Sequence, residues 1–358
     1  MLDDTLLDDR SRIDDADTGG LLRAAARAGA QVRATAEAAA ELGVERVLTE
    51  RPRALVMVTR PGVGAAVAGL VTALLGPRCP VPVVVADDVP AWVGALDVVL
   101  AHTEDPGDVQ LAESVDRASR RGARVLLTAE PEGPVAASAA RHALLIPPRV
   151  PVPQGFGFAR GFAAWVVALN ALRLLDVDLQ AVADELDREA ERCHPGHESF
   201  VNPAKALALR VAERTPLLWG LDDLATAVAA HGAGVLAAYA GLVSDVAGYP
   251  QALTRSVLHR RAVRGTSGAD IFADPDDEQE GLVRVLLLAV RRGPQAEFAR
   301  RVALETLSGA DVLEPAEEVG GGEAVCAALL ALRFELAALY LGLAAGTLGG
   351  PGRYTPAV

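Results

Sequence analysis

Residues 54–75 read ALVMVTRPGVGAAVAGLVTALL, and this stretch decides the class of fold. It opens with a short apolar run of strand length and closes with an Ala-rich run of helix length, 65–75. Pro61 and two glycines mark a turn between the two runs. A buried strand that turns into a helix is the repeating unit of a parallel sheet covered by helices.

The same alternation of short apolar runs and Ala-rich runs continues along the chain. Further strands are expected at residues 81–85, 97–101, 123–128, 142–146, 215–220, 283–290 and 311–313. Further helices are expected at residues 21–42, 109–121, 158–175, 179–192, 294–307 and 329–345. The sequence therefore predicts an α/β protein with two doubly wound, flavodoxin-like sandwiches built on parallel sheets.

A proline-rich stretch, PPRVPVP at residues 147–153, separates the two sets of elements. Such a stretch is a stiff connector, so we place the domain boundary there, between residues 1–150 and 151–358. Within the second domain, residues 224–244 contain no charged side chain. Their Ala and Gly content indicates a buried helix, broken near Gly232, rather than a membrane span.

The charge balance excludes nucleic-acid binding as the main task. The formal net charge is −13, whereas binding to a polyanion needs clustered cations. Arginine pairs such as Arg291-Arg292 are interpreted as solvated ends of helices or strands. The three cysteines lack CxxC spacing, which argues against a disulfide framework and a zinc site. The acidic N-terminus has no apolar run, so we expect no signal peptide and a cytoplasmic protein.

Several stretches follow one another in an order that is typical of one family. They are IDDADTGGL at 13–21, PVPV at 80–83, VPAWV at 89–93, NPAKALA at 202–208, PLLWG at 216–220 and ELAALYLGL at 335–343. Together they resemble the bifunctional phosphoglucose/phosphomannose isomerase branch of the SIS (sugar isomerase) family. The resemblance implies two SIS domains, a homodimer and a sugar phosphate as the ligand. We expect no cofactor and no metal.

The loop after the third strand departs from the pattern of that family. The family carries S-x-S-G-N-T-E-E-T there, with hydroxyls and backbone N–H groups that suit a phosphate dianion. Here residues 101–109 read AHTEDPGDV, in which only Thr103 keeps a hydroxyl. Glu104, Asp105 and Asp108 add negative charges, and two like charges about 4 Å apart repel by ~4 kcal/mol at an effective dielectric near 20. The sequence predicts that this phosphate cradle is lost.

An earlier segment of the family, G-M-G-G-S, aligns with TRPGVG at residues 59–64. Gly62 and Gly64 keep the tight turn, and Arg60 is a candidate compensating cation for a displaced anion site. The alternative places Arg60 on the surface at a strand end, where most arginines lie.

Two further cations complete the predicted substrate-binding set. Arg160 follows the glycine- and aromatic-rich hinge at 153–159, and it either meets a phosphate or covers the start of a helix. Lys205 is the only lysine in the chain, and it lies in the NPAKALA stretch.

Aldose–ketose isomerisation needs a base that moves a proton between C1 and C2. The family supplies a glutamate from an NENAK-like stretch, but no glutamate occurs here between Glu213 and Glu278. Asp245 is the nearest carboxylate and is expected to face solvent at a helix end. His259 falls near the family's NHNE stretch, so it is the remaining catalytic candidate. The alternative is a structural or exposed histidine.

The loop HPGHE at residues 194–198 brings two imidazoles and a carboxylate together, and we interpret it as a polar loop rather than a metal site. These observations favour a protein that binds a sugar phosphate and whose active site is degenerate. Two alternatives stay open. One is a working isomerase with a rearranged site, and the other is a non-catalytic scaffold or regulatory partner of sugar-phosphate enzymes.

Overall fold

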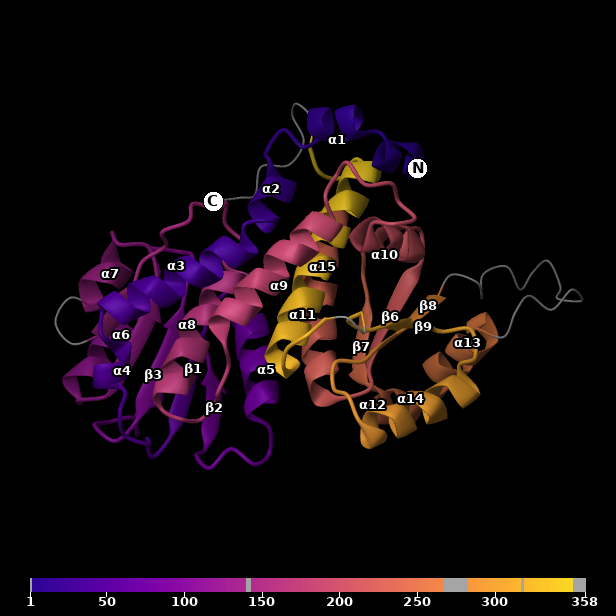
Figure 1. The fold of residues 1–358 in the computed structure, drawn as a ribbon. Helices are drawn as coiled ribbons and strands as arrows, with labels where there is room; N and C mark the ends of the chain where they lie inside the picture. The colour runs from indigo at the N-terminus through magenta and orange to yellow at the C-terminus, as the bar shows by residue number, and fades with distance from the viewer. Residues whose placement is uncertain (1, 140–142, 267–282, 317–318, 350–358) are drawn as a thin grey trace, which may run out of the picture. The chain divides into compact units, whose positions relative to one another are not determined.

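The computed structural model describes residues 2–139, 143–266, 283–316 and 319–349 (Figure 1). The chain divides into two compact units. Unit 1 consists of Met1–Ala26 together with Arg188–Val358, and unit 2 consists of Arg27–Asp187. The division falls inside helix α9 (Leu179–Arg192), whose bounds agree with those predicted.

Unit 2 is built on a five-stranded parallel sheet in the order β2-β1-β3-β4-β5. Its strands are β1 (Leu55–Thr59), β2 (Val83–Ala86), β3 (Val98–His102), β4 (Arg124–Thr128) and β5 (Ala143–Ile146). Its helices are α3 (Ala28–Glu41), α4 (Val44–Val47), α5 (Gly64–Leu75), α6 (Val109–Arg120), α7 (Pro134–Ala139) and α8 (Phe158–Ala171). This order is the doubly wound arrangement predicted from the sequence.

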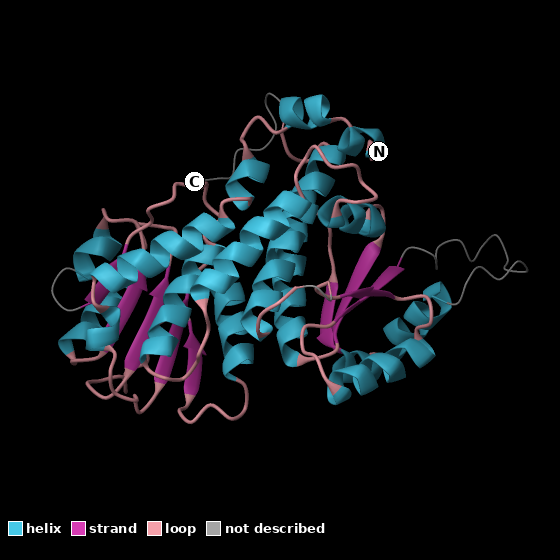
Figure 2. Ribbon diagram, viewed as in Figure 1, coloured by secondary structure: helices cyan, strands magenta, loops and turns pink. Residues whose placement is uncertain are grey.

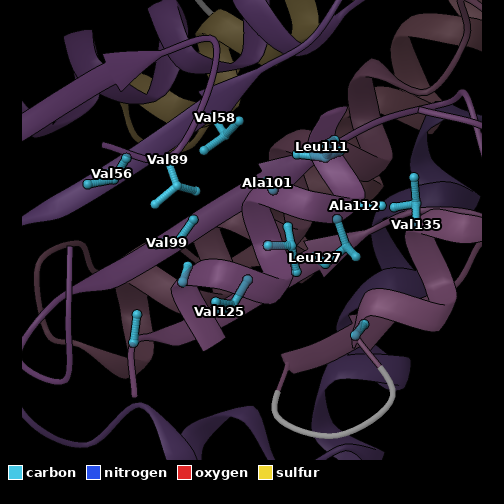
Figure 3. Packing of buried hydrophobic residues seen from close by; sticks show 14 of the residues in the cluster. Val56, Val58, Val89, Val99, Ala101, Leu111, Ala112, Val125, Leu127 and Val135 are labelled. Carbon is cyan, nitrogen blue, oxygen red and sulfur yellow. The ribbon is translucent and has the colours of Figure 1, made fainter. Parts of the chain in front are cut away.

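Alternate residues of the unit 2 strands point to opposite faces of the sheet, and both faces are buried. Figure 3 shows Val56, Val99 and Val125 on one face, packed with residues of α6 and α7 such as Leu111 and Val135. Helices α5, α8 and α3 contact β1, β4 and β5 respectively. Because Val and Leu fill the strands and Ala fills the helices, this core is closely packed.

Unit 1 is built on a four-stranded parallel sheet in the order β7-β6-β8-β9. Figure 2, viewed as in Figure 1, draws the strands in magenta and the helices in cyan. Its strands are β6 (Thr215–Gly220), β7 (Asp245–Gly248), β8 (Val283–Leu288) and β9 (Asp311–Leu313). Its helical elements are η1 (Asp4–Asp8), α1 (Arg10–Ala16), α2 (Leu21–Ala25), α10 (Pro203–Val211), α11 (Asp223–Ala240), α12 (Tyr249–Thr254), α13 (Ser256–Thr266), α14 (Pro294–Thr306) and α15 (Glu323–Ala344).

Helices α12, α13 and α14 share an apolar core with one face of this second sheet, around Leu217, Trp219 and Leu287. Helix α11 contacts β6 and packs along α15. In α15, 22 residues form a helix long and apolar enough to cross a bilayer, and its apolar window is wholly buried inside the protein. That burial is typical of a core helix.

Three local predictions need correction or refinement. The predicted helix over 21–42 is interrupted at residues 26–27, between α2 and α3. Helix α11 runs unbroken through Gly232, because a Cβ there would lie 2.7 Å from the Phe334 ring and the missing side chain permits close packing on α15. The proline-rich stretch 147–153 joins β5 to α8 within unit 2, and it lies between the two sheets in sequence. A boundary there stays a prediction.

Candidate functional site

Ligands of doubly wound sheets bind outside the carboxyl ends of the strands, where the strand order reverses. In unit 2 the reversal lies between β1 and β3, and in unit 1 it lies between β6 and β8. The loops that follow these four strands are therefore the places to look for a site.

The turn after β1 contains Arg60, Gly62 and Gly64. The Arg60 guanidinium donates to both carboxylate oxygens of Asp108, from Nε at 2.5 Å and from Nη2 at 3.2 Å, and the side chain is largely buried. It also donates to the carbonyl of Asp87. Gly62 has φ of 111°, a value that favours glycine, and Gly64 begins α5. Arg60 is thus held by this chain's own carboxylate, which also caps α6 by accepting from Leu111 N–H.

The polar side chains of the loop after β3 bind backbone groups of the chain. Thr103 is buried, and its hydroxyl accepts from the backbone N–H of Asp105 at 3.0 Å. The carboxylate of Glu104 accepts from the backbone N–H of Gly157 at 2.9 Å and of Gly155 at 3.1 and 3.2 Å. The predicted crowding of acidic groups is therefore relieved in two ways: Glu104 and Asp108 are held by internal contacts, and Asp105 is exposed to solvent.

Arg160 lies in the first turn of α8 and is 6% exposed. Its Nη1 lies 3.7 Å from the Glu130 carboxylate, and its Nε is buried without a hydrogen-bond partner. Burial lowers the pKa of Arg160, and the negative charges of Glu104 and Glu130 partly offset this by raising it. Together with Glu104, Glu130 and Gln154, Arg160 lines a cavity of about 360 Å³.

His102, the last residue of β3, is buried beside Arg160's helix. Its Nδ1 lies 2.7 Å from the Thr128 hydroxyl, and its Nε2 has no hydrogen-bond partner. Burial, with a smaller contribution from the Arg160 charge, lowers the pKa of His102 to about 3. The ring is therefore neutral in the folded protein at physiological pH.

In unit 1 the reversal point is occupied by Asp222, which follows β6. Its Oδ1 accepts from Ala225 N–H and caps α11, while its Oδ2 accepts from the N–H groups of Val290 and Arg291. The two backbone groups at the end of β8 are thus satisfied by a carboxylate of the chain itself.

A cavity of about 260 Å³ lies beside this point, at the N-terminus of α14. Three arginines line it, Arg291, Arg292 and Arg300, together with the carboxylates of Glu297 and Glu314. Arg300 Nη1 lies 2.9 Å from both Glu314 oxygens, and Arg291 Nε lies 3.1 Å from Glu323. Arg292 Nη2 donates to the carbonyls of Ala316 and Val319.

The helix that opens onto this cavity begins with Pro294, and no side chain caps it. Its free N–H groups and the positive end of its dipole favour an anion. The sequence interpretation of Arg291-Arg292 as a solvated terminus missed this cavity. Arg300 and Glu314 are brought to it from different elements, so no local signal in the sequence marks the site.

Lys205 is fully buried in unit 1, and its ammonium group is used by the chain. Nζ donates to the carbonyl oxygens of Leu7 at 2.5 Å, His197 at 2.6 Å and Pro195 at 2.7 Å, and it lies over the Tyr340 ring. An ammonium has three N–H donors, so all are accounted for. This geometry gives Lys205 a structural role, and its contact with substrate stays a prediction. Asn202 caps the helix of Lys205, because its side chain accepts from the N–H groups of Ala204 and Lys205.

His259 lies on α13 and stacks on Trp219, with ring centroids 5.8 Å apart and an interplanar angle of 10°. Its Nε2 is buried and has no hydrogen-bond partner within the part of the chain that the structure describes, and burial lowers the pKa of His259. Asp245 lies in β7 and binds Trp219 Nε1 at 2.9 Å and Arg255 at 2.6 Å. The expectation that Asp245 faces solvent at a helix end is wrong, because Asp245 lies in a strand and its carboxylate accepts hydrogen bonds from the Trp219 indole and the Arg255 guanidinium.

The other described histidines of unit 1 are His231, His194 and His197, and each contacts a polar group of the chain. His231 Nε2 lies 3.1 Å from Glu335 Oε1, which pairs α11 with α15 and which sequence reasoning did not find. In the 194–198 loop, His194 Nδ1 accepts from Gly196 N–H, and His197 Nδ1 lies 3.2 Å from the carbonyl of Arg192.

The predicted site residues thus fall into two sets. Arg60, Gly62, Gly64, Thr103 and Arg160 lie in unit 2 near the carboxyl ends of β1 and β3. Lys205 and His259 lie in unit 1, on separate elements, and neither lines the α14 cavity.

The class of protein that this architecture defines is an α/β protein with two SIS-like doubly wound sheets, whose polar groups gather at the carboxyl ends of the strands. The comparisons with known proteins agree. Residues 200–347 match the model of the bacterial phospho-glucose isomerase C-terminal SIS domain.

Solved structures resemble nearly the whole chain in fold. The tagatose-6-phosphate ketose/aldose isomerase from Escherichia coli superposes with a TM-score of 0.58 at 11% identity, covering 94% of each chain. The C-terminal domain of the glucosamine-fructose-6-phosphate aminotransferase from Francisella tularensis superposes with a TM-score of 0.57 at 12% identity, covering 92% of this chain and 98% of that one. Among curated proteins, none matches this sequence. The likenesses establish the fold, and the specific branch of isomerases predicted from the sequence stays a prediction.

Proposed function

We propose that this protein binds a phosphorylated sugar in the cavity at the N-terminus of α14 and does not isomerise it. The observation that carries the proposal is the meeting of three arginines with an uncapped helix N-terminus around one cavity. Guanidinium groups match phosphate oxygens in geometry, and a helix N-terminus adds N–H donors. The match of residues 200–347 to a phospho-glucose isomerase SIS domain supports a sugar phosphate as the ligand.

The charges around the cavity favour an anion over a cation. Three guanidinium groups and two carboxylates, Glu297 and Glu314, line the cavity. Arg300 is paired with Glu314 and Arg291 with Glu323, so Arg292 and the helix N-terminus are the groups that favour an anion. The volume of about 260 Å³ lies just below the usual ~300–1,000 Å³ of ligand pockets, which suits a small ligand with part of its sugar exposed.

The expectation of no turnover rests on the position of His259, the acid–base candidate predicted from the sequence. A general base must come within hydrogen-bond reach of the proton that it abstracts. His259 stacks on Trp219 and is not among the residues that line the α14 cavity. A working isomerase with a rearranged site is therefore the less favoured alternative, and a purely scaffolding role is the alternative if no sugar phosphate binds.

Calorimetry with glucose 6-phosphate, fructose 6-phosphate and mannose 6-phosphate tests the binding. We expect Arg292→Ala to weaken binding by roughly 10-fold or more, since a hydrogen bond to a charged group contributes about 1.5–3 kcal/mol. Arg301→Ala is the matched control, because Arg301 lies on the same helix but does not line the cavity, and its affinity should equal that of the wild type. Equal affinity in Arg292→Ala, or no binding by the wild type, would contradict the proposal.

A coupled assay for interconversion of the three hexose phosphates tests the catalytic part. We expect no turnover above a preparation from an empty vector. Turnover that His259→Ala abolishes would establish an isomerase instead.

The compartment and the assembly belong to the same proposal. We place the protein in the cytoplasm, where sugar phosphates are made, and expect a homodimer. Light scattering coupled to size exclusion measures the mass directly, against 37.1 kDa for one chain.

A further inference from the structure

The carboxylate of Glu104 lies at the N-terminus of α8 in the way that a bound anion would. Three N–H···O contacts of 2.9 to 3.2 Å join it to the backbone of Gly155 and Gly157. Gly157 is the N-cap residue of this 14-residue helix and has no side chain of its own to cap it. Glu104, 53 residues away in the sequence, supplies the negative charge that the helix end favours.

The backbone around Glu104 is shaped to let the carboxylate approach closely. A Cβ at Gly157 would lie 2.6 Å from Glu104 Oε1, so the carboxylate could not keep this position beside a larger residue. Gly155 has φ of 91°, a left-handed conformation that points its N–H toward the same carboxylate. A Cβ at Gly62, in the turn after β1, would lie 3.6 Å from Oε2.

A buried cation faces the same place. Arg160 is 6% exposed, its Nε has no hydrogen-bond partner among the described residues, and its charge interacts with Glu104. It lines the cavity of about 360 Å³ together with Glu104. An arginine left with an unused donor beside a carboxylate is a typical component of a site for planar or tetrahedral anions.

We infer that Gly155, Gly157 and Arg160 form an anion-binding site whose resident ligand is the chain's own Glu104. The site is complete, but an external phosphate or carboxylate is excluded as long as Glu104 occupies it. Glu104 therefore prevents a phosphorylated ligand from binding at this site of unit 2. This inference is separate from the proposed binding at α14.

Replacing Glu104 with alanine should vacate the site, and inorganic phosphate is the probe. The experiment uses the full chain in an Arg292→Ala background, so that binding at α14 does not contribute. In Glu104→Ala, 20 mM phosphate should raise the melting temperature by about 3 °C or more, because a ligand that binds only the folded state stabilises it. Without Glu104→Ala, phosphate should leave the melting temperature unchanged.

Matched variants distinguish the occupancy of the site by residue 104 from the general effect of removing a negative charge. Glu104→Gln keeps an oxygen that accepts from the glycines, so it should show no phosphate response. Glu132→Ala removes an exposed carboxylate from a nearby loop and should show none either. Adding Arg160→Ala to Glu104→Ala should abolish the response.

A folded Glu104→Ala protein that does not respond to phosphate would overturn the inference, as would an equal response from Glu104→Gln. If Glu104→Ala does not remain folded without phosphate, its refolded yield must rise with phosphate concentration, and a yield independent of phosphate would also overturn it. Hexose phosphate binding at α14 is measured with Glu104 intact, so failure of one proposal leaves the other standing.

Discussion

At the scale of single residues, carboxylates of the chain occupy positions where a ligand would otherwise be held. Asp108 binds Arg60, Glu104 binds the glycines before α8, and Asp222 binds the backbone at the end of β8. Each satisfies buried donors that would be costly to leave unpaired. The loops at the carboxyl ends of the strands are therefore stable without a ligand. In this they differ from an empty active site, whose polar groups have no partner until a ligand binds.

His102 gives a residue-scale prediction about pH. Its pKa is near 3 in the folded protein and near 6.5 in the unfolded chain, so only the unfolded chain takes up a proton between these values. The stability that this residue contributes is full above pH 6.5 and falls as the pH drops toward 3. Between pH 7 and pH 5, we expect His102 to reduce the free energy of unfolding by about 2 kcal/mol.

Urea unfolding at both pH values measures this loss. The comparison is His102→Asn, which keeps a polar group facing Thr128 but does not titrate. The variant should lose about 2 kcal/mol less than the wild type between pH 7 and pH 5. Equal losses in the two proteins would show that the ring is already protonated or exposed.

At the scale of elements, substituting alanine for each of two glycines of α11 should change the stability of the protein in opposite directions. A Cβ at Gly232 would lie 2.7 to 2.9 Å from three atoms of the Phe334 ring, whereas a Cβ at Gly234 meets nothing within 4 Å. Gly234→Ala should stabilise the protein by about 0.5–1 kcal/mol through helix propensity. Gly232→Ala should destabilise it, because overpacking costs about 1–3 kcal/mol and exceeds that gain.

Thermal or urea unfolding of the two variants gives the sign directly. The double variant Gly232→Ala with Phe334→Leu should be less destabilised than the sum of its parts, because a smaller side chain makes room for the methyl group. Stabilisation by Gly232→Ala alone would mean that α11 and α15 are not packed as described.

The same helix shows what sequence could and could not predict. The periodic apolar runs predicted every described strand except β7, and they predicted longer helices such as α5, α6 and α9 to within a few residues, because burial on a parallel sheet leaves a local pattern. Short helices such as α4, α7 and α12 were not predicted. The break at Gly232 was predicted from local propensity, and it is wrong because tertiary packing on Phe334 decides that position.

The candidate sites were harder to predict for a related reason. Arg60 and Lys205 have the residue types of a phosphate site, but partners 48 and 198 residues away use their donors. Arg291 and Arg292 line a cavity only because Arg300 and Glu314 fold toward them. No local pattern encodes such long-range pairings.

At the scale of the whole molecule, unit 1 is assembled from both ends of the chain. Lys205 joins them, since its Nζ donates to the carbonyl of Leu7 in the N-terminal segment. Lys205→Met keeps a long, unbranched side chain but leaves three carbonyls without their donor, and it should destabilise unit 1 by roughly 2–4 kcal/mol.

Hydrogen exchange followed by mass spectrometry locates the effect. Peptides covering residues 4–16 and α10 should exchange faster in Lys205→Met, while the sheet of unit 2 should keep its protection. Arg210→Met, at the end of the same helix, is the control and should leave these rates unchanged. Faster exchange in unit 2 alone would contradict this assignment.

The bond between Lys205 and Leu7 also sets an order of events during synthesis. The two residues are 198 positions apart, and a ribosome adds about 5–20 residues each second, so Leu7 emerges roughly 10–40 s before its partner. All of residues 27–187 is made in that interval. The first 26 residues therefore wait, unpaired and open to proteases and chaperones, until translation has passed the middle of the chain.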